Sequence, residues 1–481
     1  MENSKTEDHN SPFNPTLRYF LIEGIASQVM FTLLAIPFIS LYLASIGASP
    51  SLIGLVAAIP YASNLIQLPS ALFAEKFNRK KFSISASTVS RFSLLIMALF
   101  LRFDEKHDLL YFVILFILYN IFKEVSSVAW NSWMRDLIPM HIRGEIYSKR
   151  LAYGKLAALV VVLLFIFVFN FLNKLAFSLL FITAFLAGII SLFFIKRIEY
   201  VKVEKKYRGF KNILNGNFLK LLIPLSLWKF ATKMSLPFFS VYTVSVLKYP
   251  SWVVISLISL SQISSIYFLR ISGKIMDKFG NKPVTILAFL SFSLAAFLFT
   301  FTTMPERHVL TPLLLTVIYI LDGFYSSIPT ITLINMIAKI TPKGNSASCY
   351  ALNSTTMSLC GAAGSIVGGV VASMLLSANL AIKIDIESSL GLIKIPVVCF
   401  VNYDFLFITS SLLSLLAAKL LRYFKEEGET QEKVVKKEIK NALIHDVQSL
   451  VAYTMIYPKR FNLLSQGVSF RKGKEKLQHN Y

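Results

Sequence analysis

Six ionisable side chains lie within long apolar segments of this 481-residue chain, where charges are costly and usually serve a function. They are Glu23, Lys123, Glu124, Lys229, Lys233 and Asp322. Lys229 and Lys233 are one helical turn apart, so a helix places both ammonium groups on one face. Ammonium groups away from water attract anions, and buried carboxylates can take up and release protons. This set therefore predicts binding of a polar or anionic ligand together with proton exchange.

The sequence has no pattern typical of an enzyme, a metal site or a nucleotide-driven machine. Its three cysteines, Cys349, Cys360 and Cys399, lack metal-ligand spacing, and no nucleophile stands beside a suitable base. No Gly-x-x-x-x-Gly-Lys-Ser/Thr phosphate loop occurs, so nucleotide hydrolysis is not the expected energy source. The net charge of +23 falls in short clusters between apolar runs, which disfavours nucleic acid as a partner. We expect no enzyme activity, no cofactor and no metal.

The composition places these charges in a membrane protein built of helices. Only 16 % of the residues are charged, against roughly a quarter in a soluble domain, and 55 % are hydrophobic. The apolar runs are continuous rather than alternating, which favours helices over a barrel. Since a span needs roughly 20 apolar residues, the sequence predicts an all-α membrane protein of about twelve spans. We expect them near 18–46, 51–74, 82–102, 108–134, 148–171, 174–196, 217–246, 251–272, 283–304, 309–338, 345–377 and 397–420.

The lysines and arginines predict how these spans are oriented. They concentrate on alternate connections, so the positive-inside rule places that side and both termini in the cytoplasm of a multi-pass protein of the cell membrane. We expect a cytoplasmic segment at 1–17, a helical bundle at 18–196, a cytoplasmic linker at 197–216, a second bundle at 217–421 and a cytoplasmic tail at 422–481. Apolar residues recur every fourth position between 435 and 451, which indicates an amphipathic helix. It would lie on the inner leaflet or pack on the cytoplasmic loops.

An internal repeat relates the two halves of the chain. Residues 37–42 (Pro-Phe-Ile-Ser-Leu-Tyr) return as residues 237–242 (Pro-Phe-Phe-Ser-Val-Tyr), two hundred positions later. Residues 71–80, which follow the second span, return as residues 273–282 after the eighth. Matches at a nearly constant offset indicate a duplication of six spans. The expected fold is therefore two pseudo-symmetric six-helix bundles.

The second copy of the loop resembles the signature of the major facilitator superfamily. It contains Gly273, Asp277, Gly280 and Lys282 in the family's order of glycine, acid, glycine and base. The first copy departs from that pattern, because Ala71 and Asn78 replace the glycines and Glu75 replaces the aspartate. Residues 130–139, followed by Arg143 and Arg150, are similar to a prokaryotic subgroup of this family whose substrate is undefined. The resemblance implies the major-facilitator fold in a monomer.

The resemblance also implies roles for particular residues. In the family, the loop charges form a latch between helices, which implies a gating role here for a set that could alternatively anchor the loops by charge alone. The set comprises Glu75, Arg79, Lys80, Asp136, Gly273, Asp277, Gly280 and Lys282. The first, fourth, seventh and tenth spans line the family's central cavity. All the charges within spans that we identify lie on these four, with the exception of Arg91 on the third, which we interpret as structural.

We therefore expect a secondary transporter that moves a small polar or anionic organic solute by alternating access, coupled to protons. Asp322 or Glu23 would exchange the proton, and Lys229 or Lys233 would meet an anionic group of the solute. Two alternatives stay open: an uncoupled facilitator or exporter of amphipathic compounds, and a membrane receptor that senses a solute without moving it. The sequence does not identify the solute or the direction of transport.

Overall fold

The protein is described from a computed structural model of the whole chain. The structure describes residues 15–67, 69–70, 78–100, 107–138, 140–172, 174–200, 216–303, 307–340, 346–375, 379–388, 391–401 and 403–426. Glu75 and the amphipathic helix expected in the tail lie outside these residues. For Asp136, Gly273 and Asp277, the structure describes the backbone only.

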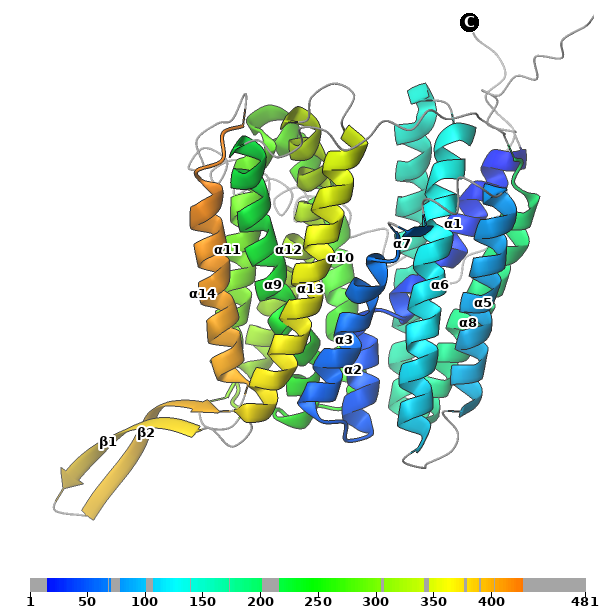
Figure 1. The fold of residues 1–481 in the computed structure, drawn as a ribbon. Helices are drawn as coiled ribbons and strands as arrows, with labels where there is room; N and C mark the ends of the chain where they lie inside the picture. The colour runs from blue at the N-terminus through cyan, green and yellow to red at the C-terminus, as the bar shows by residue number, and fades with distance from the viewer. Residues whose placement is uncertain are drawn as a thin grey trace, which may run out of the picture.

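The first half of the chain forms a bundle of long helices (Figure 1). They are α1 (Pro15–Leu33), α2 (Ile36–Ser45), α3 (Pro50–Asn64), α5 (Arg79–Phe100), α6 (His107–Leu137), α7 (Met140–Leu172) and α8 (Lys174–Arg197). The first expected span is broken into α1 and α2 just before Pro37. Proline lacks a backbone N–H and clashes with the carbonyl four residues earlier, so it is tolerated in the first turn of a new helix.

The second half forms a bundle of the same kind, with a β-hairpin inserted before its last helix (Figure 1). Its elements are α9 (Gly216–Ser245), α10 (Ser251–Phe279), α11 (Asn281–Phe299), α12 (Thr311–Ile340), α13 (Ser346–Met374), β1 (Asn379–Ser388), β2 (Gly391–Val401) and α14 (Asp404–Leu421). The two strands pair antiparallel, with an irregularity between Ile382 and Lys383. The boundary expected for the last span was wrong, because residues 397–401 belong to β2 and the helix begins at Asp404.

Ten of the described helical segments are long and apolar enough to cross a membrane. Two further helices complete the expected set of about twelve. The described part of α3 has only 15 residues, and α9 is long enough at 30 residues but carries Lys220, Lys229 and Lys233. The expected helical membrane fold of about twelve spans in two bundles is confirmed, with the β1–β2 hairpin as an addition.

The two bundles lie side by side with their helices running in roughly the same direction, so the molecule has two opposite ends (Figure 1). We call the end where α1 begins and α14 finishes the termini end, and the end that carries β1 and β2 the hairpin end. Between the bundles, α3 packs along α13, α7 along α10, and α2 against α9. These helix pairs form the interface between the two bundles.

Equivalent tyrosines of the sequence repeat occupy equivalent places in the two bundles. Tyr42 packs edge-on against Phe177 and Phe181 of α8, with ring centroids 5.4 and 6.1 Å away. Tyr242 packs edge-on against Tyr403 and Phe407 at the start of α14, at 6.2 and 5.4 Å. In each bundle the partners are four residues apart at the last helix, so one aromatic cluster was duplicated with the chain.

Small residues bring the bundles together at the hairpin end. A Cβ atom added to Gly54 of α3 would lie 2.6 Å from the Cα of Gly369 of α13 and 2.5 Å from the carbonyl oxygen of Ser365. The Ser51 hydroxyl lies 2.6 Å from the Ser373 hydroxyl, and the Ser51 backbone N–H donates to Ser373 at 2.9 Å. This contact requires glycine, since any side chain would hold α3 and α13 apart.

Candidate functional site

The two α9 lysines lie at the interface between the bundles. The ammonium groups of Lys229 and Lys233 both lie over the ring of Tyr61, at 5.4 Å from its centroid. Tyr61 belongs to α3, so the contact crosses from one bundle to the other. Neither lysine forms an ion pair with a described carboxylate. Two ammonium groups held by one aromatic face leave a net positive charge available to a ligand.

Asp322 of α12 lies beside the α9 lysines. Its carboxylate accepts a hydrogen bond from the Ser261 hydroxyl of α10 at 2.5 Å. Lys233 interacts electrostatically with Asp322, but no described cation lies within ion-pair distance of this carboxylate. Asp322 borders a small cavity of about 50 Å³, whose wall includes Pro37 of the other bundle. The cavity is lined mainly by apolar side chains, but Ser240, Tyr319 and Asp322 give it polar groups that a water molecule could bind.

Lys123 and Glu124 of α6 form a direct ion pair, with the ammonium 2.7 Å from the carboxylate. Glu124 also accepts a hydrogen bond at 2.6 Å from the Gln67 amide. The Asn64 amide, in the orientation that satisfies its neighbours, donates to Glu124 at 2.9 Å. Glu124 is only 5 % exposed. Its buried carboxylate is compensated by these three contacts, all from the first bundle.

Glu23 of α1 is paired with Arg150 of α7. The guanidinium lies 2.5 Å from the Glu23 carboxylate, which also accepts hydrogen bonds from Ser27 at 2.6 Å and from Ser191 at 3.2 Å. Arg150 stacks on the rings of Phe20 and Trp130, at 4.7 and 4.4 Å from their centroids. The Glu23 carboxylate therefore has a charge partner, which Asp322 lacks among the described residues.

The six predicted residues divide between two regions rather than lining one cavity. Glu23 and Lys123 border a cavity of about 340 Å³ inside the first bundle. Asp322 borders the small cavity described above, near the α9 lysines. A third cavity, of about 300 Å³, lies between α1, α2, α7 and α10, and its polar lining comprises Gln28, Thr32, Lys155, Gln262 and Ser265.

Two charges of α7 were absent from the predicted set. Arg150 pairs with Glu23, and Lys155 donates to the Ser265 hydroxyl of α10 at 3.2 Å, across the bundle interface. The expectation that all charges within spans except Arg91 lie on four helices is therefore wrong, since Arg150 and Lys155 lie on the fifth. Arg150 lies at the basic beginning of that span, where the sequence indicated orientation and a family resemblance but no partner, and Lys155 was not singled out.

One of the first-copy gating residues, Lys80, ties the start of α5 to the residues that follow α8. Arg79 is buried, at 8 % exposure. The Lys80 ammonium donates to the Ile198 carbonyl at 2.7 Å and lies 5.7 Å from the centroid of the Trp133 ring. The Trp133 indole in turn donates to the Glu199 carbonyl at 2.9 Å. For Lys80, the described contacts anchor the loop within one bundle.

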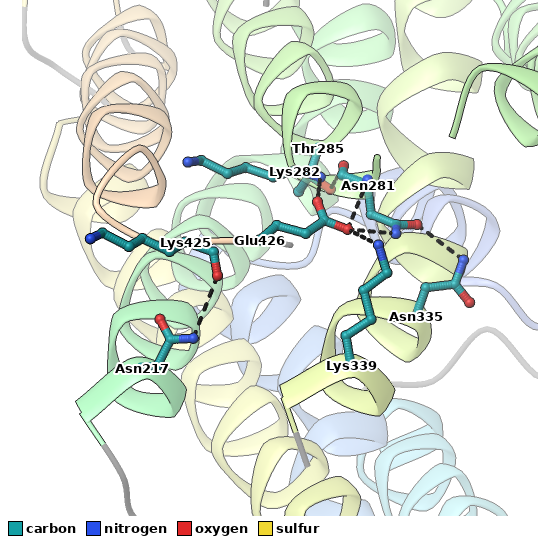
Figure 2. A network of polar contacts seen from close by, with 8 residues as sticks. All are labelled: Asn217, Asn281, Lys282, Thr285, Asn335, Lys339, Lys425 and Glu426. Atoms are coloured by element: carbon teal, nitrogen blue, oxygen red, sulfur yellow. Dashed lines mark hydrogen bonds and ion pairs between the residues drawn. The ribbon is translucent and has the colours of Figure 1, made fainter. Parts of the chain in front are cut away.

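The second copy of the loop is bound by a carboxylate from elsewhere in the chain, which the sequence did not indicate (Figure 2). Gly280 joins α10 to α11 with φ of +91°, a conformation that favours glycine, and has no side chain to cap α11. Glu426, from beyond α14, accepts hydrogen bonds from the backbone N–H groups of Asn281 and Lys282 at 3.1 and 2.6 Å. It also binds the Asn281 amide at 2.9 Å and the Lys339 ammonium at 2.7 Å. Glu426 therefore caps α11 from the far end of the chain.

Two bundles of membrane-length helices that meet at an interface bordered by charged residues have the architecture of a membrane transporter. The model of the Major Facilitator Superfamily matches residues 21–365, and the chain belongs to this family. The membership confirms the resemblance recognised in the loop signature, and with it a transporter rather than an enzyme.

Solved structures share this fold at low sequence identity. A mutant of the nucleoside transporter NupG aligns with a TM-score of 0.67 and 14 % identity, covering 86 % of this chain and 100 % of that one. A D-xylose-proton symporter aligns at 0.64 and 14 %, covering 86 % and 99 %. The peptide-transporter-family (POT) protein PepTSo aligns at 0.62 and 9 %, covering 85 % and 97 %. No curated protein matches the sequence.

Proposed function

We propose that this secondary transporter moves a small organic anion by alternating access and couples the movement to protons. The chain would lie in the cell membrane with both termini in the cytoplasm, as its basic connections indicate. The two bundles, 18–196 and 217–421, would rock about the interface, and their loops, including Arg79, Lys80, Gly280 and Lys282, would brace each bundle during the movement.

The observation that carries the proposal is the pair of unpaired ammonium groups on α9. Lys229 and Lys233 face Tyr61 of the opposite bundle and have no described carboxylate partner. An anion bound there would compensate their charge and would contact both bundles. Ligand binding would then favour a closed interface, because the ligand contacts with the second bundle form only when the bundles approach.

Asp322 is the favoured site of proton exchange. Between the two carboxylates considered from the sequence, Glu23 already holds Arg150 as its counter-ion, whereas Asp322 accepts a hydrogen bond from the neutral Ser261 hydroxyl and has no ion pair with a described cation. Proton uptake at Asp322 would change its electrostatic interaction with Lys233. The shared fold of a D-xylose-proton symporter is consistent with such coupling.

The first experiment identifies a solute and measures its uptake. A thermal-shift screen of the purified protein against carboxylates, phosphate esters, sugars, nucleosides and peptides selects a candidate. Proteoliposomes with an imposed pH gradient then measure its accumulation. We expect Asp322→Asn to abolish gradient-driven accumulation while solute exchange at equal pH persists. Glu145→Gln, which removes an exposed carboxylate of α7, is the matched control.

The lysines are tested separately from the proton site. We expect Lys229→Gln with Lys233→Gln to weaken solute binding at least tenfold, whereas Lys220→Gln, an exposed position on the same helix, leaves it unchanged. Unimpaired accumulation by Asp322→Asn would refute the coupling assignment. Tight binding without accumulation or exchange in the wild-type protein would instead support a solute receptor, and uptake that ignores the gradient would support an uncoupled facilitator.

A further inference from the structure

The cavity of about 340 Å³ inside the first bundle is a separate polar compartment. It lies between α1, α5, α6, α7 and α8, and no described residue of the second bundle lines it. Its volume is in the range of small-molecule sites. Most of its lining is polar or charged, including Glu23, Ser27, Ser87, Arg91, Lys123, Trp130 and Arg150.

The charges around this cavity do not balance. Lys123 pairs with Glu124, and Arg150 pairs with Glu23. Arg91 is left without an ion pair among the described residues, although it is only 5 % exposed. Among the described residues, its hydrogen bond is a long contact of 3.4 Å from Nη1 to the Ser87 carbonyl. A buried guanidinium without a counter-ion is energetically costly. A neighbouring carboxylate of the bundle would ordinarily compensate its charge.

The groups that face Arg91 do not provide that anion. The Glu23 carboxylate and the Tyr119 hydroxyl are its electrostatic neighbours, from α1 and α6. Glu23 is already occupied by Arg150, Ser27 and Ser191, and one carboxylate cannot neutralise two guanidinium groups. The cavity wall therefore keeps one net positive charge.

Three buried N–H donors of the cavity residues lack acceptors. Among the described residues, the Arg91 Nε, the Arg150 Nε and the Trp130 Nε1 have no hydrogen-bond partner. These groups can only donate, so they require an acceptor. A buried donor that is left unsatisfied costs about 1–3 kcal/mol. An oxyanion in the cavity would satisfy donors and charge together.

The bundle is shaped to admit the two arginine side chains. A Cβ atom at Gly188 of α8 would lie 2.7 Å from Cγ of Arg91, and one at Gly24 of α1 would lie 2.1 Å from Nε of Arg150. Both helices therefore need glycine where the arginine stems pass. Arg91 is thus held inside the bundle by close packing rather than directed outward to a membrane surface.

We propose that this cavity binds an oxyanion, a carboxylate or phosphate group, with Arg91 as its counter-ion and Trp130 as a second donor. The hydroxyl groups of Ser87, Ser126 and Ser127 border the same space and suit a hydroxylated small molecule. This site does not depend on the α9 lysines or on the transport proposed above. A free anion and an anionic lipid headgroup share the recognised chemistry.

The test measures binding to the purified full chain in nanodiscs of neutral phosphatidylcholine. Lactate and inorganic phosphate are titrated as anionic probes, with glycerol as the uncharged control, and binding is followed by calorimetry and tryptophan fluorescence. A second set of nanodiscs contains phosphatidylglycerol, to detect a lipid headgroup. We expect an anionic probe or the anionic lipid to bind, with a fluorescence change that Trp130→Phe removes and Trp252→Phe retains.

Substitution of Arg91 separates a ligand site from a structural role. Arg91→Gln should weaken binding roughly tenfold to a hundredfold, as expected for loss of charge-assisted hydrogen bonds. Arg91→Lys should recover part of the affinity, and Arg197→Gln, at the end of α8, should have no effect. Because the buried charge is unpaired, Arg91→Gln should leave the melting temperature of the ligand-free protein unchanged or higher.

Three results would overturn the proposal. Equal affinity of wild type and Arg91→Gln, or no binding of any anion, would exclude the site. Loss of binding in the variant with Lys229→Gln and Lys233→Gln, but not in Arg91→Gln, would assign the anion to α9 instead. A lower melting temperature of ligand-free Arg91→Gln would show that Arg91 is a structural residue. None of these results depends on whether transport is proton-coupled.

Discussion

Replacing Glu426 should release the start of α11. Its carboxylate accepts the backbone N–H groups of Asn281 and Lys282 and binds Lys339 (Figure 2). Removing a helix-capping acceptor costs about 0.5–2 kcal/mol. The Lys339 side chain is 44 % exposed, so its ion pair adds at most about 1 kcal/mol. We therefore expect Glu426→Ala to lower the local free energy of opening by about 2 kcal/mol.

Hydrogen exchange measured by mass spectrometry checks this value directly. A loss of about 2 kcal/mol corresponds to roughly thirtyfold faster exchange at the first turn of α11. Glu426→Gln retains one acceptor oxygen and should show a smaller increase, while Glu145→Gln on the surface of α7 should show none. Unchanged exchange at Asn281 and Lys282 in Glu426→Ala would refute the capping role.

The same clamp predicts a pH dependence. Burial alone would raise the pKa of Glu426, but the Lys339 ammonium, the Asn281 amide and the backbone N–H groups of Lys282 and Asn281 together lower it below the ordinary value of 4.5. A group with a lowered pKa stabilises the fold above its unfolded pKa and loses that contribution as the pH falls through the folded value. Protection of the α11 first turn should therefore be constant above about pH 5. It should fall below pH 4.5 in wild type, but not in Glu426→Gln.

Further predictions concern buried and interfacial contacts. Glu23→Gln leaves Arg150 without its counter-ion, so the free energy of unfolding should fall by about 3 kcal/mol and partly recover when Arg150→Gln is added, as thermal denaturation would show. Cysteines at Ser51 and Ser373, in a background without native cysteines, should cross-link on oxidation and stop solute exchange, and continued exchange by cross-linked protein would contradict rocking at this interface. Tyr61→Leu should lower thermal stability by about 1–2 kcal/mol because it removes the aromatic face from two ammonium groups, whereas Tyr61→Phe should not.

The helices could be predicted because membrane insertion imposes a length and a composition on each of them. The failure at the last span has the same origin. The run at 397–401 is apolar enough to extend a helix, and hydropathy cannot distinguish a short apolar strand from the beginning of a span. The hairpin β1–β2 was therefore missed.

The charged residues could be identified from the sequence, but their partners could not. Glu23 and Arg150 are 127 positions apart, and only helix packing decides that they meet. Lys123 and Glu124 are neighbours in sequence, but the sequence does not show that they pair with each other rather than with groups on other helices. Glu426 lies beyond the last span, where a carboxylate in a charged tail gave no reason to expect contact with the loop at Gly280.

The pairing pattern indicates which charges can respond to movement of the bundles. Glu23 with Arg150, and Lys123 with Glu124, are pairs within the first bundle, so they travel together when it rotates as a rigid body. Such pairs keep their distance and supply no energy difference between conformations. Lys229 and Lys233 instead face Tyr61 across the interface, and their surroundings change when the bundles separate. A ligand or proton that acts on these interfacial charges has a differential interaction with the two conformations, which is the physical requirement for coupling.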